Sequence, residues 1–238
     1  GLLLYFVLLK KPAQLFPNHS VVVKSEVQHE KLTKLLRRIF SSRQAWSLFF
    51  CHFGLVGAYV GFISSWAVPY GMNLYEMSRS GASQLIMVGL IGALIGAPLM
   101  SWIAGRLNTI KRPYMIVHVT VLISWSIFLF FNGVPPFSLV ILLFFIVGFG
   151  YGASALTFAA VRKSFAIIDS GIVSGFANTG GFLSAVLLPL IFGAVLDYFQ
   201  STTGNIVNGY YYGFITPVIF SIIGLIGVFY LQEQRVEQ

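Results

Sequence analysis

The sequence predicts an all-α integral membrane protein, and three features of the chain support this fold class. The chain is 57% hydrophobic and only 9% charged, whereas a soluble domain carries about 25% charged residues. Six apolar runs are each long enough to cross a hydrocarbon core about 30 Å thick as a helix. The basic residues lie in alternate segments between these runs, a pattern typical of membrane orientation. A very apolar soluble domain is a poor alternative, because it would leave large apolar surfaces in water.

The segment before the first complete span is too short to cross a membrane. Residues 1–9, GLLLYFVLL, reach only about 13 Å as a helix, so we interpret them as the end of a transmembrane helix that begins upstream. Residues 10–43 form a basic linker, in which apolar residues at helical spacing across Glu30–Phe40 predict an amphipathic helix on the membrane surface. A nucleic-acid-binding arm is the alternative. A solvated cytoplasmic loop explains the same charges, so no nucleic-acid partner is expected.

The transmembrane domain is expected over residues 44–231, in six spans predicted from uncharged runs. The spans are Gln44–Tyr75, Gly81–Gly105, Pro113–Phe131, Phe137–Val161, Gly171–Leu196 and Tyr210–Leu231. Near the end of the first span, Pro69 and Gly71 are expected to bend or unwind the helix. Residues 232–238 remain as a short polar tail.

The second and fourth spans carry closely spaced glycines, which let helices approach each other in lipid. In the second span these are Gly89, Gly92 and Gly96, and in the fourth they are Gly148, Gly150 and Gly152. The third span is barely long enough to cross the membrane. The turn Asn132–Pro136 separates it from the fourth span.

The fifth span, Gly171–Leu196, combines glycines with polar residues. Asn178 and Thr179 place polar groups inside it, and Pro189 is expected to interrupt it. Because a buried amide in a membrane needs a partner, we expect this span to pack closely against other helices. The sixth span also contains a proline, Pro217.

The placement of Lys and Arg predicts the orientation. Of the 15 such residues, all except Arg79 lie in the linker, in the Arg106–Arg112 loop, in the Arg162–Lys163 loop or in the tail. Since short basic loops stay on the cytoplasmic side, both ends of the six-span domain are predicted to be cytoplasmic. The predicted location is the plasma membrane, as a multi-pass protein of a bacterial inner membrane.

The loop after the second span carries a basic motif. Its sequence, SWIAGRLNTIKRP, begins at Ser101 and contains Arg106, Lys111 and Arg112. It is similar to the loop motif of the major facilitator superfamily, in which a glycine precedes an acid, an arginine and then a basic pair. Gly105 stands where that family has the acid, and Ser101 where it has the first glycine.

Nearly the whole chain resembles the C-terminal half of a transporter of this family: the end of helix 6, the central cytoplasmic loop and helices 7 to 12. The resemblance implies two six-helix bundles around a central cavity that opens alternately to each side. The expected partners are therefore a small-molecule solute, the lipid bilayer and an N-terminal six-helix half that precedes residue 1.

The resemblance also implies that the first helix of each three-helix unit lines the cavity, here Gln44–Tyr75 and Phe137–Val161. Polar and aromatic residues form one helical stripe on each: His52, Tyr59, Trp66 and Tyr70 on the first, and Tyr151, Ser154 and Phe158 on the second. Together with Asn178, they are the predicted solute contacts. Packing between helices is the alternative role for all of them, and anchoring at the membrane surface is a further one for Trp66 and Tyr70.

No Asp, Glu, Lys or Arg lies deep inside a complete span. A carboxylate relay for protons would then lie in the N-terminal half, and the alternative is that His52 and His118 take its place. Of the two, His52 is the better candidate for proton coupling, because histidine titrates near physiological pH. The chain has no Ser–His–Asp arrangement, cysteine cluster or phosphate-binding glycine loop, so no enzyme activity, metal or cofactor is expected. The predicted function is secondary active transport of a small organic solute by alternating access, in symport or antiport. A receptor or sensor that binds a solute without moving it is the alternative.

Overall fold

Residues 32–233 are described by the structure, a computed structural model. The predictions for residues 1–9, for residues 10–31 of the linker and for residues 234–238 of the tail lie outside this range. The chain divides into two units after Leu36. The described part of the first unit, residues 32–36, is helical and opens α2 (Leu32–Phe40), in agreement with the helix predicted for this part of the linker.

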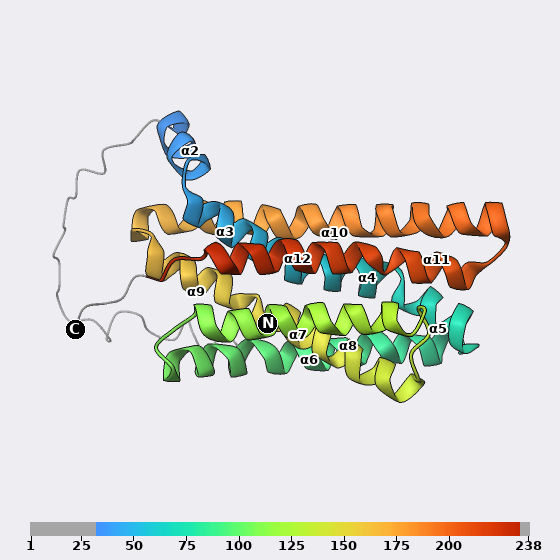
Figure 1. Cartoon of the computed structure of the whole chain (residues 1–238). Helices are drawn as coiled ribbons and strands as arrows, with labels where there is room; N and C mark the ends of the chain where they lie inside the picture. The colour runs from blue at the N-terminus through green and yellow to red at the C-terminus, as the bar shows by residue number, and fades with distance from the viewer. Residues whose placement is uncertain (1–31, 234–238) are drawn as a thin grey trace, which may run out of the picture. The chain divides into compact units, whose positions relative to one another are not determined.

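Every regular element among the described residues is helical, and six stretches are long and apolar enough to cross a membrane (Figure 1). The elements after α2 are α3 (Arg43–His52), a π-helical turn (Phe53–Gly57), α4 (Ala58–Ser65), α5 (Ala67–Tyr75), α6 (Arg79–Arg106), α7 (Lys111–Phe130), α8 (Phe137–Ala153), α9 (Ala155–Ser164), α10 (Ile167–Thr203), α11 (Ile206–Gly213) and α12 (Ile215–Tyr230). The prediction of an all-α membrane bundle is confirmed.

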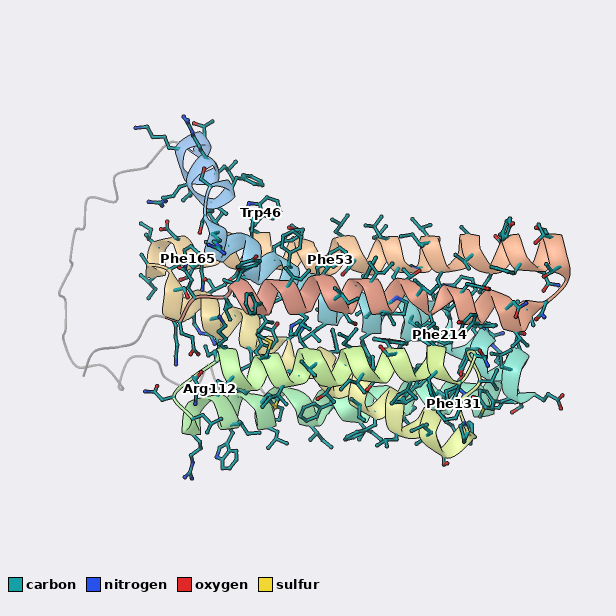
Figure 2. The ribbon with its side chains drawn as sticks, in the orientation of Figure 1. Trp46, Phe53, Arg112, Phe131, Phe165 and Phe214 are labelled. Atoms are coloured by element: carbon teal, nitrogen blue, oxygen red, sulfur yellow. The ribbon has the colours of Figure 1, made fainter. Side chains whose placement is uncertain are left out.

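Within the second unit, the spans run alternately between two ends. One end, which we call the basic end, holds the start of α3, the loop from α6 to α7, the junction of α9 with α10 and the end of α12 (Figure 1). Arg112 lies at this end and Phe131 lies at the other (Figure 2). Of the described Lys and Arg residues in this unit, only Arg79 belongs to the opposite end. The alternation of basic and non-basic loops therefore matches the alternation of the two ends.

Two of the spans are broken just before a proline. The first span breaks at Trp66, between α4 and α5, and helix α5 then continues through Pro69 and Gly71 to Tyr75. The last span breaks at Phe214, three residues before Pro217. A proline ring excludes the carbonyl four residues earlier and supplies no N–H, so each break lies one turn before the proline. The first span is thus bent at Trp66 rather than at the predicted Pro69–Gly71.

The prediction that Pro189 interrupts the fifth span is wrong. Helix α10 runs without a break for 37 residues and includes Pro189 in its interior. It is also longer at both ends than the predicted Gly171–Leu196. Membrane helices tolerate an internal proline, because neighbouring helices can satisfy the freed backbone groups.

The glycines of α6 and α8 bring these two helices into backbone contact. A Cβ atom on Gly148 would lie 1.9 Å from the carbonyl oxygen of Gly89, and one on Gly92 would lie 2.1 Å from that of Phe145. Gly152 meets the carbonyl of Ala93 in the same way. Gly148 and Gly152 of the predicted α8 cluster therefore face the side of α6 that carries its glycines, whereas Gly150 faces Val121 of α7. Close packing of this kind stabilises helix pairs in lipid.

An aromatic core fills the bundle towards the end opposite the basic end. Phe62 of α4 lies at its centre, fully buried, with ring centroids of its neighbours 5.2–6.0 Å away. These neighbours come from α5, α7, α8, α10 and the break between α11 and α12, and they are Tyr70, Trp125, Phe144, Phe192 and Phe214. Edge-to-face pairs of this kind contribute about 0.5–1.5 kcal/mol each beyond their buried area, so this core fixes how the spans pack.

Candidate functional site

A chain of hydrogen bonds crosses four helices around His52. Nδ1 of His52 lies 3.3 Å from the Thr157 hydroxyl of α9, and Nε2 lies 3.2 Å from Oδ1 of Asn178 of α10. The Thr157 hydroxyl is in turn 2.6 Å from the hydroxyl of Tyr114 of α7. Phe158 packs its ring against the imidazole, with centroids 5.1 Å apart. We call these five residues the His52 cluster.

The direction of the hydrogen bonds follows from the chemistry of the groups. The Asn178 oxygen only accepts, so Nε2 of His52 donates to it. In the neutral ring Nδ1 then accepts, and the Thr157 hydroxyl donates to it. Thr157 therefore accepts from Tyr114. All donors point in one direction, from Tyr114 through Thr157 and His52 to Asn178.

The cluster is buried at one side and partly open at the other. His52 is 4% exposed and Thr157 and Tyr114 are 0% exposed, whereas Phe158 and Asn178 are half-buried. Buried polar groups in a membrane protein are costly unless they are paired. The paired His52 cluster therefore gives the bundle a polar site that reaches its surface through Phe158 and Asn178.

A second pair of predicted residues meets next to the glycine contact. The rings of Tyr59 of α4 and Tyr151 of α8 are stacked, with centroids 4.5 Å apart and an interplanar angle of 13°. A Cβ atom on Gly89 would lie only 3.0 Å from the Tyr59 ring. The ring therefore fits against α6 because Gly89 has no side chain. Ser154 is buried at the break between α8 and α9, between the turns that carry Tyr151 and Phe158.

Trp66 and Tyr70 do not join either group. The Trp66 indole N–H donates to the carbonyl of Pro189, at 3.3 Å, and its ring packs on Phe192. Tyr70 is fully buried in the aromatic core, and its hydroxyl donates to the carbonyl of Gly133 at 2.9 Å. These contacts fit the alternative of packing between helices. The π-helical turn and the break at Trp66 separate these residues from His52 and Tyr59.

The predicted loop motif lies at the basic end. The Arg106 guanidinium lies over the Trp102 ring, 5.3 Å from its centroid. The Lys111 ammonium donates to the carbonyl of Phe229, at 2.7 Å, and Arg112 is exposed. A Cβ atom on Gly105, the position where the family motif has an acid, would meet nothing within 4 Å.

A carboxylate does reach this loop, from the residues after α12. Oε1 of Glu233 accepts hydrogen bonds from the Thr109 hydroxyl at 2.6 Å, from the Lys111 N–H at 2.8 Å and from the Ile110 N–H. Helix α7 has no capping side chain of its own, so Glu233 caps it. Partial burial raises the pKa of Glu233, but these hydrogen bonds and the charge of Lys163 outweigh it, so the pKa lies below its ordinary value of 4.5.

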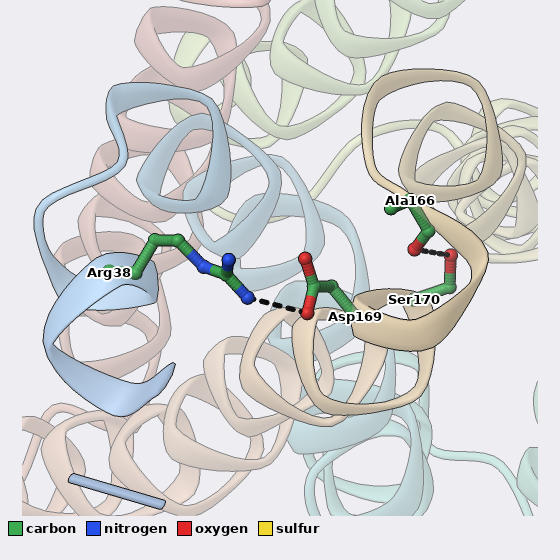
Figure 3. Close-up of polar contacts among 4 residues, drawn as sticks. All are labelled: Arg38, Ala166, Asp169 and Ser170. Atoms are coloured by element: carbon green, nitrogen blue, oxygen red, sulfur yellow. Dashed lines mark hydrogen bonds and ion pairs between the residues drawn. The ribbon is translucent and has the colours of Figure 1, made fainter. Parts of the chain in front are cut away.

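Two further contacts tie elements together at the basic end. Nε2 of Gln44 donates to the Ser164 hydroxyl and to the Gln232 carbonyl, and the Gln232 N–H donates back to Oε1 of Gln44 at 2.9 Å. The Arg38 guanidinium donates to Oδ1 of Asp169 at 2.7 Å, joining the end of α2 to the first turn of α10 (Figure 3). A carboxylate is favourable there, because the helix N-terminus carries partial positive charge.

The sequence did not predict Tyr114 or Thr157 as members of the His52 cluster, or Glu233 as the cap of α7. Thr157 lies one turn beyond Ser154, so a search for polar residues inside apolar spans would have found it. Tyr114 follows Pro113 at the start of a span and looks like an interfacial aromatic, and nothing local distinguishes Glu233 from the other charges of the tail.

The described residues offer no metal site, because no three His, Cys, Asp or Glu side chains in residues 32–233 are grouped to hold an ion.

Comparison with known proteins gave one result. The model of a protein family described as the Major Facilitator Superfamily matches residues 1–189, and no curated protein matches the chain. The match covers the first four spans, with both glycine clusters, and most of α10. On this match and on the six apolar helices, the chain belongs to the major facilitator superfamily.

Proposed function

We propose that the chain is the C-terminal six-helix half of a secondary active transporter, which moves a small organic solute by alternating access. Its family is one of transporters, and its six long apolar helices suit a membrane bundle. The observation that supports the proposal most directly is the His52 cluster. It is a chain of paired polar side chains that joins four separate spans of the bundle.

The cluster links protonation to the contacts between helices. A neutral His52 ring accepts from Thr157 through Nδ1, whereas the protonated ring carries a proton on both nitrogens. Binding of a proton therefore obliges the Thr157 hydroxyl to turn away, which also changes its hydrogen bond with Tyr114. Proton binding at His52 would alter the packing of α3 against α9 and α7, and this supports proton coupling by symport or antiport.

The solute would contact the half-buried side of the cluster. Phe158 and Asn178 offer an aromatic face and an amide there, and the Tyr59–Tyr151 pair offers a second aromatic surface. In the described spans, Lys and Arg lie only at or near the ends. An organic phosphate would need a cation at membrane depth, so an organic solute without a phosphate group fits better.

The proposed location is the plasma membrane, with the basic end in the cytoplasm. Basic segments remain on the cytoplasmic side during insertion. The alternation of the six spans puts the segments that carry 14 of the 15 Lys and Arg residues on the same side of the membrane.

The test is counterflow in proteoliposomes. The complete protein is first screened for small organic compounds that raise its melting temperature, and a labelled hit is then offered to vesicles loaded with the same unlabelled compound. Transient accumulation of label is expected from the protein and not from empty vesicles. Binding without flux would support the alternative of a receptor or sensor. For His52→Ala, uptake driven by an imposed pH gradient is expected to fall by at least about tenfold, the effect of losing a proton-transfer group.

A further inference from the structure

An apolar groove opens between α6 and α7 near the basic end, with α8 as its floor. Its volume is about 190 Å³. The residues that line it include Ile103 of α6 and Leu107 just after it, Pro113 and Thr120 of α7, and Ile146 and Phe149 of α8. The Thr120 hydroxyl donates to the carbonyl of Ile116 in its own helix. The groove is therefore lined by apolar side chains, and its one hydroxyl group, that of Thr120, already has a hydrogen-bond partner.

The surface around the groove has the character of a face in contact with lipid. Leu107 is 56% exposed and Ile116 is 65% exposed, which would be costly in water but is neutral against acyl chains. From Pro113 to Val121 the groove runs two turns along α7, about 12 Å. That length suits the upper part of a single acyl chain lying along the helix.

Two arginines stand where the groove meets the basic end. Arg106 lies three residues after Ile103, and Arg112 lies four residues before Ile116, so each arginine is on the groove-lining side of its helix, one turn closer to the basic end. Neither forms an ion pair with a carboxylate among the described residues. Arg106 lies over the Trp102 ring, and Trp102 is 58% exposed, as is usual for a tryptophan at the level of lipid headgroups.

The other charged groups near this loop, Glu233 and Lys111, have hydrogen-bond partners of their own and do not neutralise the two arginines. The carboxylate of Glu233 is held by the hydroxyl of Thr109 and by backbone N–H groups at the start of α7. The ammonium of Lys111 is held by a carbonyl of α12. The apolar groove thus ends at two guanidinium groups, and guanidinium binds phosphate oxygens in bidentate fashion.

We propose that this groove binds one anionic phospholipid, with an acyl chain between α6 and α7 and the phosphate on Arg106 and Arg112. Charge complementarity favours an anionic lipid over a zwitterionic one. The inference depends on the membrane location of the six helices and not on the proposed transport function.

The test is native mass spectrometry of the complete protein released from bilayers of phosphatidylcholine and phosphatidylglycerol. The protein is expected to retain one phosphatidylglycerol in preference to phosphatidylcholine. The double variant Arg106→Gln/Arg112→Gln should weaken retention by about 25-fold, about fivefold for each basic residue near the lipid surface. The matched double variant Arg37→Gln/Arg162→Gln removes the same charge elsewhere at the basic end, at two exposed residues, and should leave retention unchanged.

A third variant separates a lipid from a free phosphate. Thr120→Trp keeps both arginines but fills the groove, so it should abolish retention of phosphatidylglycerol while leaving the melting temperature unaltered. Unchanged retention in Thr120→Trp would overturn the proposal, since the headgroup alone would then suffice. Equal losses in the two charge-removing variants, or equal retention of the two lipids by the unmodified protein, would also overturn it.

Discussion

At the scale of single residues, the His52 cluster depends on one hydroxyl group. The Thr157 oxygen is both the acceptor for Tyr114 and the donor to His52, and all three side chains are almost fully buried. Loss of that oxygen would leave two polar groups without partners in an apolar interior. Such groups cost about 1–3 kcal/mol each, so Thr157 serves both stability and the state of His52.

We therefore expect Thr157→Val to lower the free energy of unfolding by about 2–6 kcal/mol, the sum for the two groups, and to change the pH dependence of uptake. Thermal unfolding in detergent and uptake by proteoliposomes at several pH values are the measurements. Thr216→Val is the matched control, because Thr216 is also buried but has no part in the cluster. The role given to Thr157 is wrong if both variants show the same stability and the same pH profile.

Glu233 is expected to stabilise the fold in a pH-dependent way. Its pKa in the folded protein lies below the ordinary 4.5, so the ionised form favours folding. This stabilisation is complete above about pH 4.5 and is lost as the pH falls through the lowered folded value. Glu233→Gln should cost about 0.3–1 kcal/mol near pH 7, the usual size of a charge effect at a helix N-terminus.

The measurement for Glu233 is the difference in melting temperature between Glu233→Gln and the unmodified protein across pH 3–8. The difference should be largest at neutral pH and vanish in acid. A difference that is constant over the whole range would mean that the carboxylate charge is not the source of the effect.

At the scale of elements, the contact between α6 and α8 depends on glycine. Gly148 of α8 lies against the backbone of Gly89, so an added methyl group cannot be accommodated by a side-chain movement. The helices would have to separate, and their neighbours Tyr59 and Tyr151 would move with them. Overpacking of this kind costs about 1–3 kcal/mol.

Gly148→Ala is therefore expected to lower the melting temperature, although alanine is by about 1 kcal/mol the better helix former. Gly105→Ala is the control on α6, because a Cβ atom there meets nothing within 4 Å. It should leave the melting temperature unchanged or raise it slightly. Equal effects of the two substitutions would contradict the backbone contact.

At the scale of the whole molecule, the orientation in the membrane can be tested with two cysteines. Ser201 near the end of α10 and Gln232 after α12 are both exposed and lie at opposite ends of the bundle. The native Cys51 is fully buried, so it should not react. With other cysteines of the complete protein replaced, Ser201→Cys should be labelled by an impermeant maleimide in intact cells. Gln232→Cys should be labelled only after the cells are opened, and the reverse pattern would invert the predicted orientation.

Much of the candidate site could be located by sequence, but its connections could not. His52, Phe158 and Asn178 were predicted separately, on three different helical segments, and the structure brings them into one cluster. Their link through Thr157 to Tyr114 joins residues far apart in the chain, so no local pattern reveals it. Trp66 and Tyr70 were grouped with His52 on the assumption of a regular helix, which the π-helical turn and the break at Trp66 remove.

The sequence by itself determined that the described residues 32–233 contain six membrane spans and which ends of those spans lie together. Those properties belong to each segment separately, because the transfer of an apolar run into lipid and the retention of basic loops depend on local composition. Only the tertiary structure decided where the helices break, that α10 passes unbroken through Pro189 and that Glu233 caps α7. These depend on which distant groups meet, since a freed carbonyl or an uncapped N–H is tolerated only where packing supplies a partner.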